Sequence, residues 1–398
     1  MKLLNSTVML LLLLSPLMAD NKHLILAQGD AWLPSMPKNL IQNHDYIEKL
    51  PFSGFIMVGN TFTNITMKRG VKLTYNEVWD EVKGLKNLYK EKTENFLRVD
   101  ITFPGDFWDR EAWQQVNRNF EVLAMVAKDL GFKGIAIDDE GYGPTAKKMI
   151  NYKFPTEDEV MRNPRAYREW QRKGAQYKSV DSDGYSNPLY TFKEHMTKVT
   201  SLFKDIMISM QRGYPDITVL VYYGASFAHE NANLQNLTIV NLGRPSEQEY
   251  KGPMFLGLKH GRVGKSTLHD MAENYRYREE KHFKQSYLLR KFKMATNAYN
   301  HNLNDSYQWV VPREDRRSWF QNVNVGFMTS NIPLPSDYPE FDTTNRTTKR
   351  DIFQATNFAL KYSDKYVIYY SSYENWLLPN KQKNPSKRWV NMVKALQE

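Results

Sequence analysis

The sequence predicts an α/β protein folded as a single (β/α)8 TIM barrel. Short apolar runs rich in β-branched residues alternate with amphipathic helical segments along the 398 residues. The chain has neither a Gly-x-Gly-x-x-Gly fingerprint nor a phosphate-binding loop with Lys-Ser/Thr, which argues against an open, doubly wound sheet. No linker-like stretch separates two halves. We therefore expect one catalytic domain over residues 20–398.

The predicted strands are short apolar runs bounded by polar or turn-forming residues. The sixth has the weakest pattern, because it ends in acidic residues and contains few apolar ones. The eight runs are 23–27, 55–58, 96–103, 135–140, 217–224, 266–273, 323–330 and 366–372.

Helices are predicted between and after these strands. Thr74 followed by Glu77 is a capping box that begins one helix, and Gly131 is a stop signal for another. The predicted ranges are 38–49, 74–90, 109–130, 192–212, 252–263, 277–300, 349–362 and 389–397. Residues 143–188 are polar and contain one further helical pattern at 165–177. We interpret them as a loop insertion after the fourth strand, where a lid or binding wall would lie.

Residues 1–19 have the proportions of a signal peptide. One lysine precedes an apolar run, and Pro16 and Ala19 come before polar residues, which predicts cleavage after Ala19. No later stretch approaches the ~20 apolar residues of a spanning helix. We expect an exported, periplasmic or secreted protein without a membrane span.

Composition excludes several classes of site. The absence of cysteine excludes disulfides, thiolate metal sites and a cysteine nucleophile. The formal net charge is +10, but Lys and Arg are spread among Asp and Glu, so we expect no nucleic-acid partner. Aromatic residues make up 13% of the chain, as suits both a large core and a sugar-binding cleft. We expect a monomer that binds a polysaccharide or oligosaccharide and needs no cofactor.

Three consecutive acids follow the fourth predicted strand: Asp138, Asp139 and Glu140. Side chains alternate along a strand, so Asp138 and Glu140 share one face and Asp139 lies on the other. Two carboxylates on one face at the carboxyl end of a barrel strand are typical of acid/base chemistry on a sugar or a phosphate. The structural alternative is that one acid caps a helix and another pairs with an arginine.

The end of this strand resembles the Asp-x-x-Asp-x-Asp-x-Glu motif of chitinase-like glycoside hydrolases. Asp138 and Glu140 match its last two acids, whereas Lys133 and Ala136 occupy the earlier acidic positions. The chain also has Phe-Ser-Gly at the second strand, Asn-Phe-Leu-Arg on the third, Asp-x-Glu-x-Tyr on the fourth and an acid-plus-Tyr stretch on the sixth. In this order of motifs it resembles a group of exported bacterial, glycoside-hydrolase-like barrel proteins. The resemblance implies the barrel fold, with Glu140 as the general acid and Asp138 assisting it.

The other predicted site residues lie at the carboxyl ends of strands, where barrel enzymes place their active sites. Asp270 or Glu273 is the candidate second carboxylate. Arg98 and Asp100 could bind substrate or form a structural ion pair inside the barrel. Trp376 could be a sugar-stacking surface or a core packing residue. The substrate-binding candidates are Trp32, Asn60, Arg98, Asp100, Tyr142, Tyr223, Tyr275, Glu374 and Trp376.

These features predict a glycoside hydrolase that cleaves a polysaccharide by carboxylate acid/base catalysis. One alternative is a catalytically inactive glycan-binding or cell-envelope protein on the same fold. Another is a metal-dependent hydrolase or a polysaccharide lyase. The eight histidines form no His-x-His or His-Glu-x-x-His motif, so we assign no metal ligands.

Overall fold

A computed structural model describes residues 22–29, 33–104, 107–140, 192–225, 251–272, 277–293, 311–330, 348–371, 374–379 and 384–396. The predicted signal peptide at 1–19 lies outside these ranges. So does the predicted insertion at 143–188, together with its helix at 165–177.

The strands form one parallel sheet of nine segments in the order β7-β6-β5-β4-β3-β2-β1-β9-β8. Only Gly326 separates β7 from β8 in the chain; β7 pairs with β6, and β8 pairs with β9. These two segments are therefore one interrupted strand that joins both ends of the sheet, so the nine segments make eight strands. The strands are β1 (His23–Gln28), β2 (Gly54–Met57), β3 (Phe96–Asp100), β4 (Gly134–Asp138), β5 (Thr218–Val221), β6 (Thr267–Asp270), β7 (Asn324–Val325), β8 (Phe327–Ser330) and β9 (Tyr366–Ser371).

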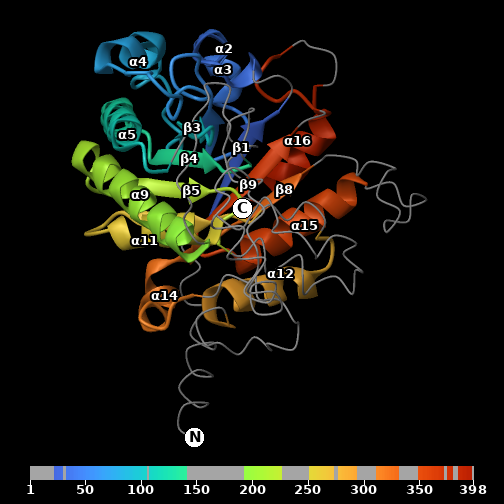
Figure 1. The fold of residues 1–398 in the computed structure, drawn as a ribbon. Coiled ribbons are helices and arrows are strands. Elements are labelled where there is room, and N and C mark those ends of the chain that lie inside the picture. The colour runs from blue at the N-terminus through green and yellow to red at the C-terminus, as the bar shows by residue number, and fades with distance from the viewer. Residues whose placement is uncertain are drawn as a thin grey trace, which may run out of the picture.

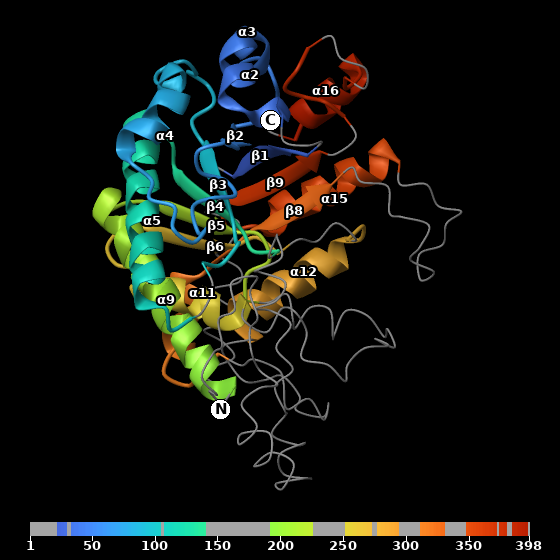
Figure 2. The same ribbon diagram turned by 45° about the horizontal axis from the view of Figure 1, so that its top comes forward.

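Helices surround this sheet, as Figures 1 and 2 show, and the predicted (β/α)8 barrel is confirmed. Among the described residues, no helix is both long and apolar enough to cross a membrane. The α-helices are α2 (Pro37–Gln42), α3 (His44–Ile47), α4 (Tyr75–Val82), α5 (Arg110–Leu130), α9 (Phe192–Gly213), α11 (Lys251–Gly261), α12 (Glu280–Leu288), α14 (Arg316–Asn322), α15 (Lys349–Tyr362) and α16 (Lys387–Lys394). Shorter helical turns are η2 (Leu33–Ser35), η3 (Lys83–Leu85) and the π-helical η5 (Leu289–Lys293).

The core has two layers, which strand alternation separates. The larger cluster packs the outer faces of the strands against the helices and includes Leu97, Ile137 and Leu268. The smaller cluster contains the alternate residues, among them Phe96 and Ala136. This second cluster faces the barrel interior. Because side chains alternate along a strand, residues two positions away from its members also point inward.

Local sequence signals set several helix ends. The Thr74 hydroxyl accepts from the backbone N–H of Glu77, and the Glu77 side chain accepts from Thr74, so the capping box is confirmed. Gly131 ends α5 in a left-handed conformation with φ 78°, which glycine adopts without the steric cost of a Cβ.

Other predicted helices are shorter or divided. The range predicted as 74–90 is α-helical only to Val82, continues as η3, and meets Asn87 at φ 59°, which interrupts a right-handed helix. The range predicted as 38–49 forms two helices, α2 and α3. Within the described part of 277–300, α12 passes into η5. Helix α14 was not predicted.

Close packing of α11 against α9 fixes one wall of the barrel. A Cβ built on Gly257 would lie 2.3 Å from the Thr200 carbonyl oxygen, and one on Gly261 would lie 2.4 Å from that of Lys204. The absence of side chains at these two positions lets the helix backbones approach each other. Helix α11 is thereby held in register, with its first described residue, Lys251, at the carboxyl end of the barrel.

Candidate functional site

The barrel interior carries charged side chains at the carboxyl ends of β3 and β4. Phe96 and Ala136 belong to the interior cluster, so alternation directs Arg98, Asp100 and Asp138 inward as well. All three are almost completely buried. The predicted common face for these residues is therefore present in the fold.

Arg98 binds both interior aspartates. Its Nε donates to Oδ1 of Asp100 at 2.7 Å, and a terminal guanidinium nitrogen donates to Oδ2 of Asp138 at 2.7 Å. Burial disfavours the charged guanidinium, but Asp138, Tyr222 and Asp100 more than offset this and raise the pKa of Arg98. The predicted Arg98–Asp100 ion pair is confirmed, and Asp138 completes it.

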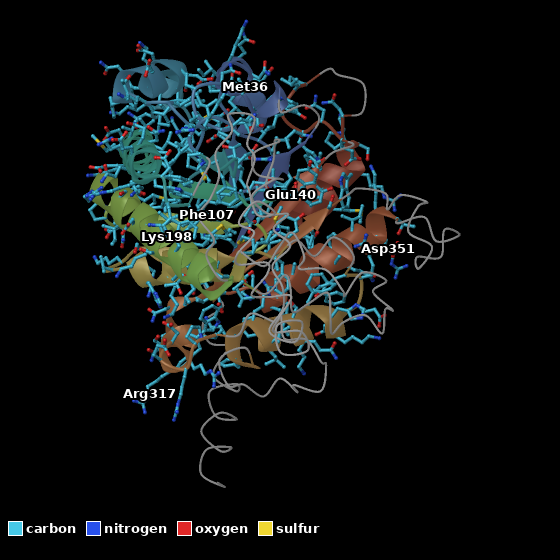
Figure 3. The ribbon with its side chains drawn as sticks, viewed as in Figure 1. Met36, Phe107, Glu140, Lys198, Arg317 and Asp351 are labelled. Carbon is cyan, nitrogen blue, oxygen red and sulfur yellow. The ribbon has the colours of Figure 1, made fainter. Side chains whose placement is uncertain are left out.

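Glu140 lies just beyond β4, near the centre of the view in Figure 3, over the barrel strands. Its backbone N–H donates to Oδ1 of Asp138 at 3.2 Å, and its Oε1 accepts a hydrogen bond from the Tyr223 hydroxyl. The residue as a whole is exposed, while its carboxyl group is turned towards Tyr223. The site thus fixes the orientation of one carboxyl oxygen at the carboxyl end of the barrel.

Burial of its carboxyl group raises the pKa of Glu140 to about 7, and the charge of Asp138 adds to the effect. Lys251 and Arg98 act in the opposite direction. A carboxyl group that titrates near neutrality can give up a proton and take one back under the same conditions, as a general acid must.

Two further aspartates in this group also hold their protons more tightly than usual. Burial, with repulsion from Asp138, raises the pKa of Asp100 against the opposing charge of Arg98. Burial likewise raises the pKa of Asp139, against the opposing charge of Lys251. Oδ1 of Asp139 accepts from the backbone N–H of Tyr223 at 2.9 Å, so this acid supports the turn after β5 from the outer face.

Lys251 is part of the site although it was not predicted. It is 4% exposed, and its Nζ lies 3.5 Å from the centroid of the Tyr223 ring. Tyr222 was also missed: it belongs to the interior cluster, and the Arg98 guanidinium lies 5.7 Å from its ring centroid. The sequence gives no signal for either residue, because both contacts join segments that lie apart in the chain.

Asp270 does not join the interior group. It shares the outer face of β6 with Leu268, it is 1% exposed, and its Oδ1 lies 3.5 Å from a guanidinium nitrogen of Arg290 on η5. The same guanidinium donates to the backbone carbonyls of Asp270 and Gly326 at 2.8 Å each. The Asp270 side chain thus lies on the outer face of the strand, against Gly224, where its charge contributes to the raised pKa of Asp139.

Three other candidates make contacts with residues other than Glu140. The Trp376 side chain is fully buried and packs against Phe52 with ring centroids 5.0 Å apart, which makes it a core residue. Glu374 pairs with Lys349 of α15 at 2.7 Å. Asn60 is exposed after β2, and its backbone N–H donates to Glu81 at 2.8 Å.

The remaining candidates, Glu273, Trp32, Tyr142 and Tyr275, lie outside the described residues. Within the ranges described above, no group of three or more His, Cys, Asp and Glu side chains is arranged to hold a metal ion.

Comparison with known proteins assigns no family. No protein-family model matches the chain, and no curated protein matches it significantly. Among solved structures, an endo-1,4-beta-mannanase from Eisenia fetida aligns with a TM-score of 0.41 and 12% identity, covering 95% of this chain and 92% of that one. A GH18 chitinase from Pseudoalteromonas aurantia aligns with a TM-score of 0.37 and 11% identity, covering 94% and 99%.

A third solved structure, a 3-keto-D-glucoside 4-epimerase from E. coli, aligns with a TM-score of 0.38 and 12% identity, covering 94% of this chain and 98% of that one. These likenesses are loose, and the proteins differ in activity. The fold assignment therefore rests on the strand order and register of the chain itself.

Proposed function

We propose that this protein is a glycoside hydrolase in which Glu140 is the general acid and Asp138 supports it. The observation that carries the proposal is the placement of Glu140: an exposed residue at the carboxyl end of the barrel, with a carboxyl pKa raised to about 7. Enzymes of this chemistry need a carboxylic acid that is still protonated near neutral pH.

In the proposed reaction, the Glu140 proton passes to the glycosidic oxygen as the bond between that oxygen and the anomeric carbon breaks. A water molecule then adds to the anomeric carbon, and its released proton returns to the Glu140 carboxylate. Asp138 lies on the same inward face and raises the pKa of Glu140, so it keeps the acid protonated before the reaction.

In the proposed mechanism Asp138 acts through Glu140, because its own carboxylate is buried and accepts from Arg98 and from the backbone N–H of Glu140. Arg98 holds this carboxylate in place. The predicted second carboxylate, Asp270 or Glu273, stays a prediction, and Asp270→Asn and Glu273→Gln would test it directly.

The proposal is tested by reducing-sugar release from neutral, N-acetylated and uronate-containing polysaccharides. Glu140→Gln should lower release from the cleaved substrate by ~100-fold or more, the scale of a lost general acid. Glu121→Gln, on the outer helix α5, is the matched control and should retain full activity, because Glu121 pairs with Arg212 away from the barrel interior. Equal activity of Glu140→Gln and the wild type would exclude the mechanism.

The same panel separates the alternative functions. An ultraviolet-absorbing unsaturated product from uronate polymers would indicate elimination and therefore a lyase. Glycan binding without product from either protein would indicate a binding module. Loss of product in chelator would indicate a metal-dependent hydrolase.

A further inference from the structure

Lys251 is buried, which is unfavourable for a cation because the charged ammonium loses its hydration. It lies on α11 at the carboxyl end of the barrel, and only 4% of its surface is exposed. A lysine is stable at such a position only if negative groups compensate for lost hydration. Asp139 and Glu140 supply that compensation, since the charge of Lys251 lowers the pKa of both carboxyl groups.

Tyr223 links Lys251 to Glu140 through two contacts and makes a third with Asp139. Its ring lies under the Lys251 ammonium, with 3.5 Å between Nζ and the ring centroid. Its backbone N–H donates to Asp139 at 2.9 Å, and its hydroxyl donates to Oε1 of Glu140. At 7% exposure, the Tyr223 side chain has little room to rotate away. A continuous chain of contacts thus runs from the Lys251 ammonium through the Tyr223 ring and hydroxyl to the Glu140 carboxyl group.

We propose that Lys251 and Tyr223 form a positioning pair for Glu140, in which the Lys251 ammonium fixes the Tyr223 ring and the Tyr223 hydroxyl orients the Glu140 carboxyl group. The inference deepens the proposed hydrolase function and rests on it. The pair directs one Glu140 oxygen inward and leaves the other free to face the glycosidic oxygen.

The pair also balances the charge around the acid. Asp138 and Asp139 favour the protonated form of Glu140, whereas Lys251, Arg98 and the hydroxyl donor favour the ionised form. Without Lys251 the acid would hold its proton too tightly to release it efficiently at neutral pH. The titratable and charged groups that face Glu140 from the described elements are Arg98 and Asp100 of β3, Asp138 and Asp139 at the end of β4, Tyr223 after β5 and Lys251 of α11.

The test is a pH titration monitored by NMR in protein labelled at the glutamate carboxyl carbons. The Glu140 signal is assigned by its absence in Glu140→Gln, and the midpoint of its titration is measured. Lys251→Met should raise the midpoint by about 1 pH unit or more, because a nearby cation is lost. Lys251→Arg should restore a midpoint close to that of the wild type. Tyr223→Phe should also raise it, because the carboxylate loses a hydrogen-bond donor.

Lys259→Met is the matched control. Lys259 lies on the same helix, is 8% exposed and pairs with Asp315 at 2.6 Å, so its loss disturbs a buried ion pair of the same helix without touching Tyr223. It should destabilise the protein and leave the Glu140 midpoint unchanged. An unchanged midpoint in both Lys251→Met and Tyr223→Phe, or an equal shift in Lys259→Met, would overturn the proposal.

The titration needs no substrate, so the two proposals can fail separately. If Glu140→Gln abolishes sugar release and Lys251→Met leaves the midpoint in place, the hydrolase stands and the positioning pair falls. If Lys251→Met moves the midpoint and no glycan is cleaved, the contacts are real but the acid they orient is not a hydrolase acid. In that case the positioning role falls together with the proposed function.

Discussion

The Arg98 guanidinium on β3 donates to Oδ2 of Asp138 on the neighbouring strand β4 at 2.7 Å, and both side chains are almost fully buried. The same guanidinium binds Asp100 at 2.7 Å, so one cation serves two interior carboxylates. Removing one partner of a buried ion pair leaves an uncompensated charge, which costs far more than the pair contributes when intact.

Arg98→Met should therefore lower the free energy of unfolding by about 3–5 kcal/mol. Urea unfolding followed by circular dichroism measures this change. Arg212→Met is the control, because Arg212 pairs with Glu121 on the surface, and such pairs contribute about 0–1 kcal/mol. Equal effects of the two substitutions would mean that the interior carboxylates do not depend on Arg98.

His269 should make the protein less stable as the pH falls. Its side chain is buried in the barrel, 4.9 Å from Tyr366 between ring centroids, and burial lowers its pKa to about 3 from an ordinary value of 6.5. Between these two values the unfolded chain binds a proton that the folded protein does not, so stability decreases with falling pH by at most about 1.4 kcal/mol per unit.

Between pH 6.5 and 5, the slope of stability against pH should therefore be smaller in His269→Gln than in the wild type, by up to about 1.4 kcal/mol per unit. The raised pKa values of Asp100, Asp139 and Glu140 give a slope of opposite sign in this window, but these groups are present in both proteins and cancel in the comparison. Parallel slopes for both proteins would show that His269 takes up its proton equally in the folded and unfolded states.

Gly257→Ala should loosen the packing of α11 on α9. The added Cβ would lie 2.3 Å from the Thr200 carbonyl oxygen, and backbone atoms at that distance must move apart. We expect a loss of about 1–3 kcal/mol in stability, measured by urea unfolding. Ser201→Ala, at an exposed position of α9, should change stability by less than about 0.5 kcal/mol. A neutral Gly257→Ala would show that the two helices are not in backbone contact.

The pH dependence of sugar release should follow the protonation of Glu140. Burial and Asp138 raise its pKa to about 7, and a general acid acts only in its protonated form, so kcat/KM should fall as the pH rises through about 7. Rates measured from pH 5 to 9 at low substrate concentration give this profile. If the wild-type kcat/KM does not fall above pH 7, Glu140 is not the general acid. If the same fall persists in Glu140→Gln, it is caused by another group.

Much of the fold could be predicted because its signals are local. Periodic apolar runs located all the strands, and Thr74, Glu77 and Gly131 marked helix ends through contacts within one turn. Alternation also placed Asp138 on the inner face and Asp139 on the outer one. The interruption at Gly326 could not be predicted, because it reflects pairing with two different strands far apart in the sequence.

The site was predictable where it follows a strand and not where it depends on contacts between distant segments. Lys251 meets Tyr223 only because α11 packs against the barrel, and no spacing in the sequence shows that contact. Trp376 follows the last strand, as a sugar-stacking residue would, but it packs against Phe52 in the core. Alternation from Leu268 would have placed Asp270 on the outer face, had the short sixth strand been followed in register.

The most direct test of Glu140 as general acid compares the wild type and Glu140→Gln on aryl glycosides of the cleaved sugar. If Glu140 donates a proton to the leaving oxygen, its loss should lower kcat/KM by ~100-fold or more for a weakly acidic phenol. The loss should shrink steadily as the phenol becomes more acidic and needs no proton. An equal loss for every phenol, or no loss for the weakest one, would contradict the role of Glu140 as the acid.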